Sequence, residues 1–214
     1  MKLKKSGRPT DATLRERRRE EILEAAAQLF AEHGYSETDT QVLADRLRVG
    51  KGTLYRYFRT KRELFLAAAD RVMHRLRQAV DDSMAGVEDP LEGIARAVRA
   101  YLEFFANQPE FVELLIQERA LFKDRKKPTY FEHREANTER WRSFYRDLIA
   151  AGRIRDVPPD RITDVFGNLL YGTMFTNYFA GQRKPTEAQA QDILDIIYCG
   201  ILSRPERRRR GLDD

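Results

Sequence analysis

Apolar residues recur at intervals of three and four along most of the chain, the spacing that places side chains on one face of an α-helix. The first such stretch runs from about Thr13 to His33, and Gly34 follows it as a helix stop. The sequence lacks strictly alternating runs bounded by Asn-Gly or Asp-Gly turns, so the pattern favours helices over a sheet. The expected buried face of the first helix comprises Ile22, Leu23, Ala26, Leu29 and Phe30.

Two short helical patterns follow and meet at Arg48-Val49-Gly50. Thr38 and Gln41 are spaced as a capping box that opens the first pattern. Its apolar positions are Val42, Leu43 and Leu47. The second pattern turns only Leu54 and Phe58 inward, and its other side chains are basic, hydroxylated or aromatic. This arrangement predicts a helix-turn-helix.

Proline and turn residues mark where the remaining helices begin. A capping box of Thr60 and Glu63 opens a long connecting helix, and Asp89 caps a further helix at its Pro90 start. Four more starts are marked by Pro109, Pro128, Pro158-Pro159 and Pro185-Thr186. With the last helix ending near residues 203–205, the sequence predicts an all-α fold of about nine helices.

A chain of 214 residues, 42% of them hydrophobic, can bury a substantial core. Its apolar runs are too short for a membrane span and its N-terminus lacks the apolar segment of a secretory signal, so we expect a cytoplasmic protein without a membrane partner. Cys199 is the single cysteine, which excludes an intrachain disulfide. Because basic residues are absent within a helical turn of it, we interpret Cys199 as a small buried hydrophobe rather than a redox sensor.

Positive charge is concentrated in two segments, although the formal net charge of the chain is only +5. Residues 1–19 contain eight Lys and Arg against two acids, and residues 41–62 contain seven against one. This is the charge pattern expected of a surface that binds phosphate. The second helix of the pair would be about 10 Å long, which fits a major groove roughly 12 Å wide. The alternative, a solvated connector, leaves this charge pattern unexplained, so we predict double-stranded DNA as a partner.

Three segments between about Arg17 and Leu66 resemble the DNA-binding domain of the tetracycline-repressor-like (TetR) family of bacterial transcription regulators: ILEAAAQLFAEHGY, TQVLADRLRV and GKGTLYRYFRTKRELF. The resemblance implies a homodimer whose two recognition helices enter successive major grooves of a palindromic operator. It also implies a repressor with a C-terminal helical domain, in which a small effector binds and releases the protein from DNA. Gly50 departs from the family pattern, in which serine is common at this position.

The resemblance further implies roles for individual residues. The base readers implied are Gln41, Lys51 and Arg56. The phosphate contacts implied are Thr53, Tyr57 and Lys61, and Tyr55 suits either role. Thr40 and the cap at Thr38 or Asp39 place the first amide groups of the earlier helix toward the DNA backbone, and Gly52 permits close approach.

Residues beyond about Asp82 carry no trusted family signature, so an effector site is predicted from residue types alone. Aromatic residues recur across several helices together with hydroxyl, amide and charged groups, the expected lining of a mostly apolar pocket. We therefore predict a hydrophobic or aromatic small molecule as effector. The opposing interpretation is that these aromatic residues form ordinary core. The predicted contacts are Tyr101, Phe105, Glu118, Phe122, Trp141, Tyr145, Phe166, Tyr171, Phe175 and Tyr178.

Two C-terminal segments, residues 160–181 and 187–202, have apolar surfaces wider than one core-facing stripe. A second apolar face needs a second partner, so we predict that a homodimer interface includes Phe175 and Ile196. The alternative is that both segments lie centrally within one subunit.

The predicted organisation is a basic disordered arm over residues 1–12, a DNA-binding domain over 13–65, an effector-binding and dimerisation domain over 66–205, and a frayed basic tail over 206–214. An enzyme is not predicted, because His33, His74 and His133 stand on separate helices without a partner one turn away. A phosphate-binding loop and a nucleophile motif are also absent from the sequence. We therefore predict no cofactor and no metal site. The competing hypothesis is a helical DNA-binding protein without an effector.

Overall fold

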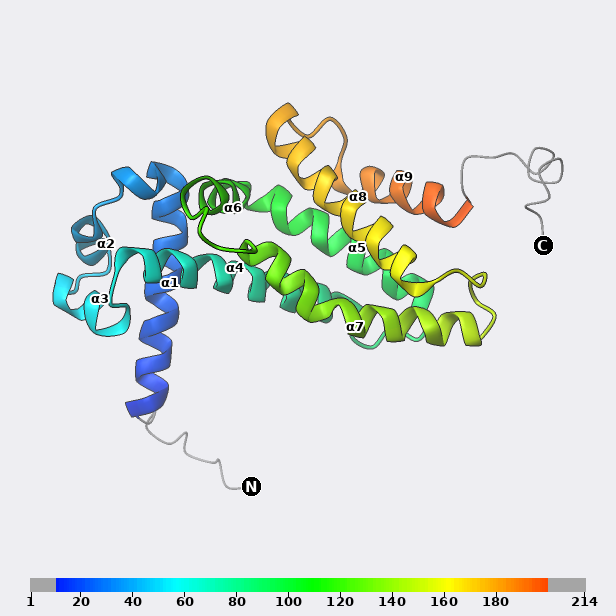
Figure 1. Ribbon diagram of the computed structural model, residues 1–214, viewed down its shortest axis with the longest axis horizontal. Helices are drawn as coiled ribbons and strands as arrows, with labels where there is room; N and C mark the ends of the chain where they lie inside the picture. Colours follow the sequence, from blue (N-terminus) through cyan, green and yellow to red (C-terminus); the bar gives the residue numbers. More distant parts are fainter. Residues whose placement is uncertain (1–10, 200–214) are drawn as a thin grey trace, which may run out of the picture. The chain divides into compact units, whose positions relative to one another are not determined.

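The computed structural model describes residues 11–199, which form nine helices and no strand (Figure 1). This confirms the all-α prediction. In chain order the helices are α1 (Asp11–Glu37), α2 (Thr40–Arg46), α3 (Lys51–Tyr57), α4 (Lys61–Met84), α5 (Pro90–Asn107), α6 (Glu110–Leu121), α7 (Thr129–Ala150), α8 (Pro159–Ala180) and α9 (Thr186–Cys199). The last two residues of the predicted arm, 11 and 12, are helical. The rest of the arm, the predicted helix end near residues 203–205 and the tail over 206–214 lie outside the described residues.

The starts of α4 to α9, marked in the sequence by capping residues and prolines, are confirmed. At the start of α4, Glu63 N donates to Thr60 Oγ1 at 3.0 Å, and Arg59 N donates to the Glu63 carboxylate at 2.8 Å. At the start of α5, Leu91 N donates to Asp89 Oδ1 at 3.2 Å. The four later helices begin at the predicted prolines or one residue after them. At α4 and α5, local side chains thus satisfy amide groups that a helix start leaves without partners.

The chain divides into two compact units, each built from two stretches of sequence. The first unit combines Met1–Arg77 with Gln108–Gly167, and the second combines Gln78–Asn107 with Asn168–Asp214. α4 and α8 therefore contribute residues to both units. The predicted domain boundary after residue 65 stays a prediction.

In the first unit, α1 packs against α6 and buries the apolar face predicted for it. Gly34 interrupts α1 with a φ of 79°, a left-handed conformation that glycine adopts without a steric penalty. Beside this break, the Phe65 ring lies 5.1 Å from the Phe30 ring and 5.4 Å from the Phe122 ring, centroid to centroid. Edge-to-face pairs of this kind add about 0.5–1.5 kcal/mol each beyond their burial. The cluster therefore holds α1, α4 and the end of α6 together.

In the second unit, α5 packs against α9, and Tyr198 OH donates to Leu91 O at 2.9 Å. Partial burial raises the pKa of Tyr198 to about 12. The side-chain amides of Asn177 and Gln189 exchange hydrogen bonds of 2.8 and 3.0 Å between α8 and α9. Cys199 is exposed, so its interpretation as a small buried hydrophobe is wrong: the buried side of α9 faces away from it. Among residues 11–199, no helix combines the length and apolar character needed to cross a bilayer.

Candidate nucleic-acid interface

The start of α2 is formed by Asp39 rather than by Thr38. Asp39 Oδ1 accepts a hydrogen bond from Gln41 N at 2.8 Å, the bond of an N-cap. Thr38 is only 4% exposed, and its hydroxyl donates to Gly34 O at 2.6 Å, which closes the preceding helix. The predicted capping box of Thr38 and Gln41 is therefore wrong. Thr38 is buried and positions the connection between α1 and α2 through its hydrogen bond to Gly34 O.

Asp39 places a negative charge at the N-terminus of α2. The hydrogen bond from Gln41 N, followed by that from the Lys51 ammonium, lowers the pKa of the Asp39 carboxyl. The distance from Lys51 Nζ to Asp39 Oδ1 is 3.2 Å, and both side chains are substantially exposed. Exposed ion pairs are weak, so this contact orients Lys51 while leaving it free to exchange Asp39 for another acceptor.

The turn between α2 and α3 is formed by the backbone. Arg48 has a φ of 54°, unusual for a residue with a side chain, and Val49 N donates to Ala44 O at 2.9 Å. Gly50 is the N-cap of α3 and accepts from Thr53 N at 2.8 Å through its carbonyl. The departure from serine at position 50 thus leaves α3 without a side-chain cap.

Leu54 and Phe58 are buried beneath α3, as predicted from their spacing. Val42, one of the apolar positions at helical spacing in α2, is 49% exposed. α2 instead buries Leu43 and Ala44, because a seven-residue helix packed at a turn has room for only a narrow buried face.

The outer surface of α3 consists of polar and aromatic side chains. Tyr55 and Arg56 are exposed, as is Gly52 in the first turn, where an added Cβ would meet only open space. The Tyr55 hydroxyl lies 3.1 Å from Thr40 Oγ1, a hydrogen bond that ties α3 to the first turn of α2. Gln41 is exposed beside it. The structure therefore brings most of the predicted DNA-contacting residues onto one surface.

A groove of ≈ 910 Å³ runs between α1 and α3. The Arg15 guanidinium lies 5.9 Å from the centroid of the Tyr57 ring, which joins the two walls. Arg15 and Arg18 were not among the contacts predicted from the sequence, although the arginine-rich run of the first helix was the available signal. The groove is lined by Asp11, Leu14, Arg15, Arg17, Arg18, Glu21, Val49, Thr53, Arg56 and Tyr57.

Lys61, a predicted phosphate contact, lies at the start of α4. Its ammonium donates to Ser36 O at 3.1 Å and lies 4.8 Å from the centroid of the Tyr35 ring. These contacts fix the α1–α2 connection against α4. An ammonium has three donors, so Lys61 retains capacity for a phosphate oxygen.

Residues 22–68 match the family described as bacterial regulatory proteins, tetR family, and residues 87–174 match the tetracyclin repressor-like C-terminal domain. The two regions together cover more than half of the chain. The chain belongs to the TetR family. These two matches confirm the resemblance seen in the sequence.

Individual relatives agree with this TetR assignment. The chain is 37% identical over 87 residues to the uncharacterized HTH-type transcriptional regulator YhgD of Bacillus subtilis (strain 168), covering 41% of this chain and 46% of the relative. It thus spans about half the length of the first curated relatives it matches. The TetR family regulator PfmR from Thermus thermophilus is 26% identical, with a TM-score of 0.66 over 85% of this chain and 99% of PfmR. FadR from Bacillus subtilis, solved in complex with stearoyl-CoA, has the same fold, with 16% identity and a TM-score of 0.72 over 86% of this chain and 99% of FadR.

The predicted effector residues of this TetR-family chain fall into separate clusters. In the first unit, the Tyr145 ring stacks on Trp141 and on Phe166, with centroid distances of 6.2 and 6.0 Å. Phe122 is buried elsewhere in this unit, in the aromatic cluster with Phe65. Phe122 is therefore better explained as core beside the helix-turn-helix than as an effector contact.

Glu118, also predicted to contact an effector, is 1% exposed and joins α6 to α7. Its Oε1 atom accepts from Thr129 N at 2.9 Å, from the Thr129 hydroxyl at 2.9 Å and from Arg125 Nη1 at 2.8 Å. Its Oε2 atom meets no donor among the described residues. Glu118 therefore has a structural role and keeps one acceptor for a ligand or water.

In the second unit, the remaining predicted residues lie on α5 and α8. The rings of Tyr101 and Phe105 are 5.3 Å apart, and Tyr101 OH lies 3.8 Å from the Met174 sulfur. Along α8, the Tyr171 and Phe175 rings are 4.8 Å apart, and Tyr178 packs on Phe179 at 5.2 Å. Within each unit these residues form aromatic layers, and their role as one effector site stays a prediction.

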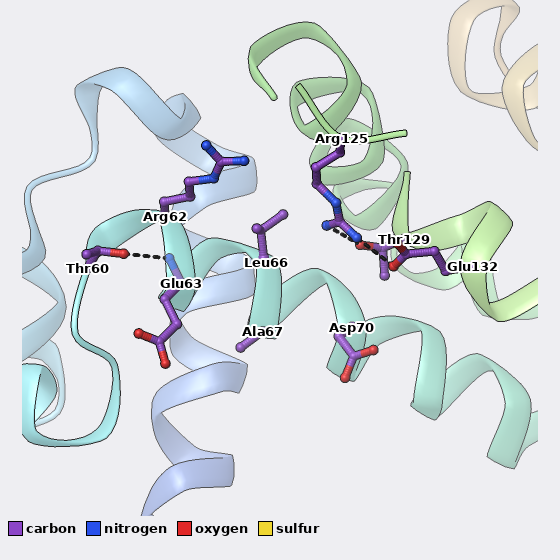
Figure 2. Close-up of a pocket in the computed structure, with 9 residues that line it drawn as sticks. All are labelled: Thr60, Arg62, Glu63, Leu66, Ala67, Asp70, Arg125, Thr129 and Glu132. Atoms are coloured by element: carbon purple, nitrogen blue, oxygen red, sulfur yellow. Dashed lines mark hydrogen bonds and ion pairs between the residues drawn. The ribbon is translucent and has the colours of Figure 1, made fainter. Parts of the chain in front are cut away.

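A second cavity, of ≈ 500 Å³, lies beside the first turns of α4 (Figure 2). Figure 2 shows Arg125 bonded to Thr129 and Glu132 on one side, and Thr60 bonded to Glu63 on the other. Neither this cavity nor the α1–α3 groove is lined by a predicted effector residue. Its lining is Thr60, Arg62, Glu63, Leu66, Ala67, Asp70, Arg125, Thr129 and Glu132.

Proposed function

We propose that this TetR-family regulator binds a palindromic operator as a homodimer and represses transcription until a hydrophobic effector releases it from DNA. The main support for this proposal is the outer surface of α3. Leu54 and Phe58 fix α3 from below, while Tyr55 and Arg56 are exposed above. A helix anchored in this way can enter a major groove without rearranging its own core.

Base reading is assigned to Arg56 and Lys51, with Gln41 as a third reader. Arginine and lysine recognise the two acceptors of guanine in the major groove. Lys51 exchanges its Asp39 partner for a base on binding, so its contribution is expected to be smaller than that of Arg56. The proposed phosphate contacts are Thr53, Tyr57 and Lys61, joined by Arg15 and Arg18 of α1.

Selection of bound sequences from a random duplex library tests this assignment. We expect enrichment of a palindrome whose half-sites are separated by about one helical turn or a multiple of it, roughly 34–36 Å per turn. The double variant Tyr55→Ala/Arg56→Ala should bind DNA without enriching that sequence. Enrichment of a single non-palindromic half-site by the wild type would contradict the dimer, and absence of enrichment would contradict sequence reading.

Dimerisation is supported by apolar side chains that α8 and α9 leave in contact with water. Phe179 of α8 is 69% exposed, Ile196 of α9 is 50% exposed, and Phe175 of α8 is half-buried. Exposed apolar residues clustered on two neighbouring helices are typical of a protein interface. In a two-fold dimer, the same surface of a second chain covers them.

The proposed effector is a mostly apolar molecule that contacts aromatic residues among those predicted from the sequence. FadR shares this fold and was solved with stearoyl-CoA, which supports acyl-CoA thioesters as the first class to test. Glu118 Oε2 is available to a donor group of such a ligand. By linkage, a ligand that prefers the DNA-free form weakens operator affinity by the same factor, typically about 5–150-fold.

A TetR-family regulator without an effector is the second hypothesis. The two cavities described above are lined by residues other than the predicted effector contacts, and this agrees with either hypothesis. Operator titrations with and without stearoyl-CoA, shorter acyl-CoA thioesters and aromatic acids, run beside thermal melts, separate the hypotheses. A compound that stabilises the protein and weakens operator binding supports effector release.

Enlarging a side chain among the aromatic residues tests where such a compound binds. Thr173→Trp should abolish the response and leave operator affinity unchanged. Stabilisation without any change in operator affinity would contradict release by that compound. If the whole panel neither stabilises the protein nor changes its operator affinity, the effector-free hypothesis is favoured.

A further inference from the structure

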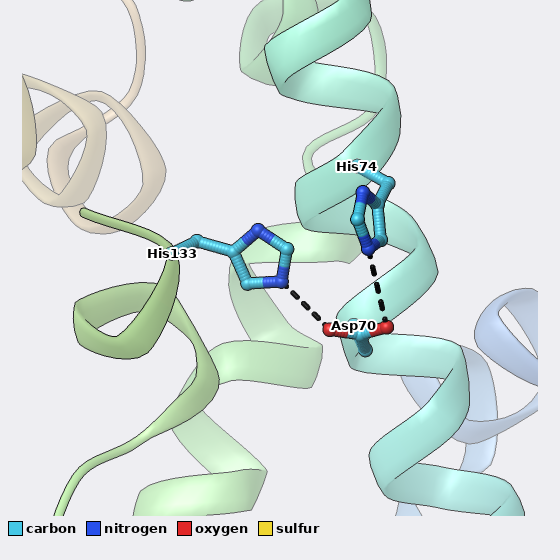
Figure 3. A group of neighbouring side chains, drawn as sticks. All are labelled: Asp70, His74 and His133. Atoms are coloured by element: carbon cyan, nitrogen blue, oxygen red, sulfur yellow. Dashed lines mark hydrogen bonds and ion pairs between the residues drawn. The ribbon is translucent and has the colours of Figure 1, made fainter. Parts of the chain in front are cut away.

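Asp70 and His74 of α4 and His133 of α7 form a cluster within the first unit (Figure 3). His133 Nε2 lies 2.7 Å from Asp70 Oδ1, and His74 Nε2 lies 3.5 Å from Asp70 Oδ2. The two imidazole rings stand edge to face with their centroids 4.8 Å apart. The expectation that the histidines lack a partner one turn away is therefore wrong for His74, whose partner is Asp70. Asp70 and His74 lie one turn apart on α4, and tertiary packing brings His133 of α7 next to them.

The positions of the three side chains suit a ligand that arrives from solvent. Asp70 and His74 are separated by four residues on one helix, which places them on the same face. The side chains of Asp70 and His74 are 52% and 62% exposed, whereas that of His133 is 14% exposed. The His133 imidazole is thus held by packing, and the exposed side chains of Asp70 and His74 can adjust around it.

The spacing of the ligand atoms is close to that of a metal site. One oxygen or nitrogen from each residue lies within 4.8 Å of the other two. Zinc bonds of about 2.0–2.1 Å in a tetrahedral site place neighbouring ligand atoms about 3.3 Å apart. His133 Nε2 lies 2.7 Å from Asp70 Oδ1 and His74 Nε2 lies 3.5 Å from Asp70 Oδ2, so each imidazole has a carboxylate oxygen close to this spacing. Because the His74 side chain is exposed, rotation of its ring can bring its ligand nitrogen closer to the other two ligand atoms.

Charges around the cluster do not oppose a cation strongly. Arg62 and Arg125 line the neighbouring cavity, which Asp70 also lines (Figure 2). The Arg62 guanidinium pairs with Asp124, and that of Arg125 pairs with two carboxylates, those of Glu118 and Glu132. The cavity also offers room for water molecules to complete the coordination of an ion held by three side chains.

We propose that Asp70, His74 and His133 bind a divalent transition-metal cation of the Zn²⁺ class, which then links α4 to α7. Two imidazoles with one carboxylate favour Zn²⁺, Ni²⁺ or Cu²⁺ over Mg²⁺ and Ca²⁺, whose preferred ligands are all oxygen. This site is separate from the DNA surface and from the predicted effector residues, so it stands or falls independently of the proposed function. A hydrogen-bonded His–Asp–His network without a metal explains the same contacts, and the experiment must distinguish the two.

The test uses full-length, tag-free protein stripped of metal and titrated with Zn²⁺ by calorimetry and thermal melting. We expect one Zn²⁺ per chain. At a free Zn²⁺ concentration of about a hundred times Kd, the melting temperature should rise by about 5–10 °C. Mg²⁺ at the same concentration should leave it unchanged. A wild-type protein that binds no Zn²⁺ overturns the proposal in favour of the hydrogen-bonded network.

Matched variants locate the bound ion. His74→Ala and Asp70→Asn change exposed side chains, so both should fold and both should weaken Zn²⁺ binding by at least about tenfold. His33→Ala is the control, because His33 is 54% exposed on α1 and away from the cluster. Cys199→Ser controls for the single thiol. Undiminished binding by both cluster variants, or an equal loss in either control, contradicts the site.

Discussion

α3 and α8 place their apolar residues in opposite ways. α3 buries Leu54 and exposes Tyr55 and Arg56. α8 spans 22 residues and buries only Met174, while Leu169 and Phe179 are exposed. Arginine and tyrosine are well solvated until DNA arrives, whereas apolar area left in water costs about 25 cal/mol per Å². The surface of α3 thus suits a partner that binds reversibly, and the surface of α8 suits a permanently bound partner.

The largest expected effect comes from placing a charge on the exposed apolar surface of α8 and α9. Ile196→Glu, and likewise Phe175→Glu, should convert a dimer into a monomer. Operator affinity should then fall to the non-specific level, by about 10³-fold or more, because one recognition helix reads too few base pairs. Sedimentation and operator titration measure the two effects. Gln191→Glu, on an exposed position of α9, is the matched control, and a monomer that binds operator tightly would refute the model.

Removing the anchor beneath α3 should have the next largest effect. Leu54 is 2% exposed, so Leu54→Ala leaves a cavity and should lower the free energy of unfolding by about 2–5 kcal/mol. Urea denaturation provides the measurement. Val42→Ala removes an exposed apolar side chain and should change the free energy of unfolding by less than about 0.5 kcal/mol. Similar losses for both would mean that the burial difference between them does not govern stability.

The polar side of the comparison is tested by Arg56→Ala. Loss of a base contact should cost about 1–3 kcal/mol on operator and much less on random duplex. Competition titrations on both duplexes report the ratio. Arg59→Ala, exposed just beyond α3, should leave this ratio unchanged. Equal losses on operator and random DNA for Arg56→Ala would remove it from the base readers.

The phosphate assignment of Lys61 predicts a different pattern. Lys61→Ala should weaken binding to all sequences alike and reduce the salt slope of log K by about one unit. Titrations at several salt concentrations measure the slope. If the slope is unchanged, the contact of Lys61 with Ser36 O is its whole role.

The smallest expected effect concerns the cap of α2. The pKa of Asp39 is lowered in the folded protein, so its charge contributes stability above the unfolded pKa of about 3.9, and this contribution is lost as pH falls through the lower folded value. Asp39→Asn keeps the capping oxygen but does not titrate. The difference in urea midpoint between wild type and Asp39→Asn should therefore shrink between pH 5 and pH 3. A constant difference over this range would show that the carboxylate charge is not what Gln41 N and Lys51 stabilise.

Features that depend on a few neighbouring residues could be predicted from the sequence. Thr60 with Glu63, and Asp89 before Pro90, set helix starts because a side chain meets an amide group within one turn. Leu54 and Phe58 revealed the inward side of α3 through their spacing alone. At the start of α2 the same reasoning failed by one residue, because Thr38 and Asp39 both offer a cap and Thr38 is drawn to Gly34 O.

The candidate site was predictable in part. The exposed side chains of α3 belong to one short segment, so their common surface follows from helical geometry. Arg15 and Arg18 joined that surface only when α1 packed beside α3. Aromatic composition suggested one effector site, which stays a prediction; the structure shows only that Tyr145 belongs to the first unit and Tyr101 to the second. Residue type alone does not say which neighbour a ring will pack against.

By itself, the sequence determined the helices, their order, the family and the polar face of the recognition helix, because these depend on local spacing and on side chains within a turn or two. Only the tertiary structure decided that Val42 is exposed, that Phe122 belongs to the core and that His133 meets Asp70 and His74. Such contacts join helices distant in the chain. Their free energy comes from close packing and burial, which depend on how whole helix faces meet rather than on any one residue.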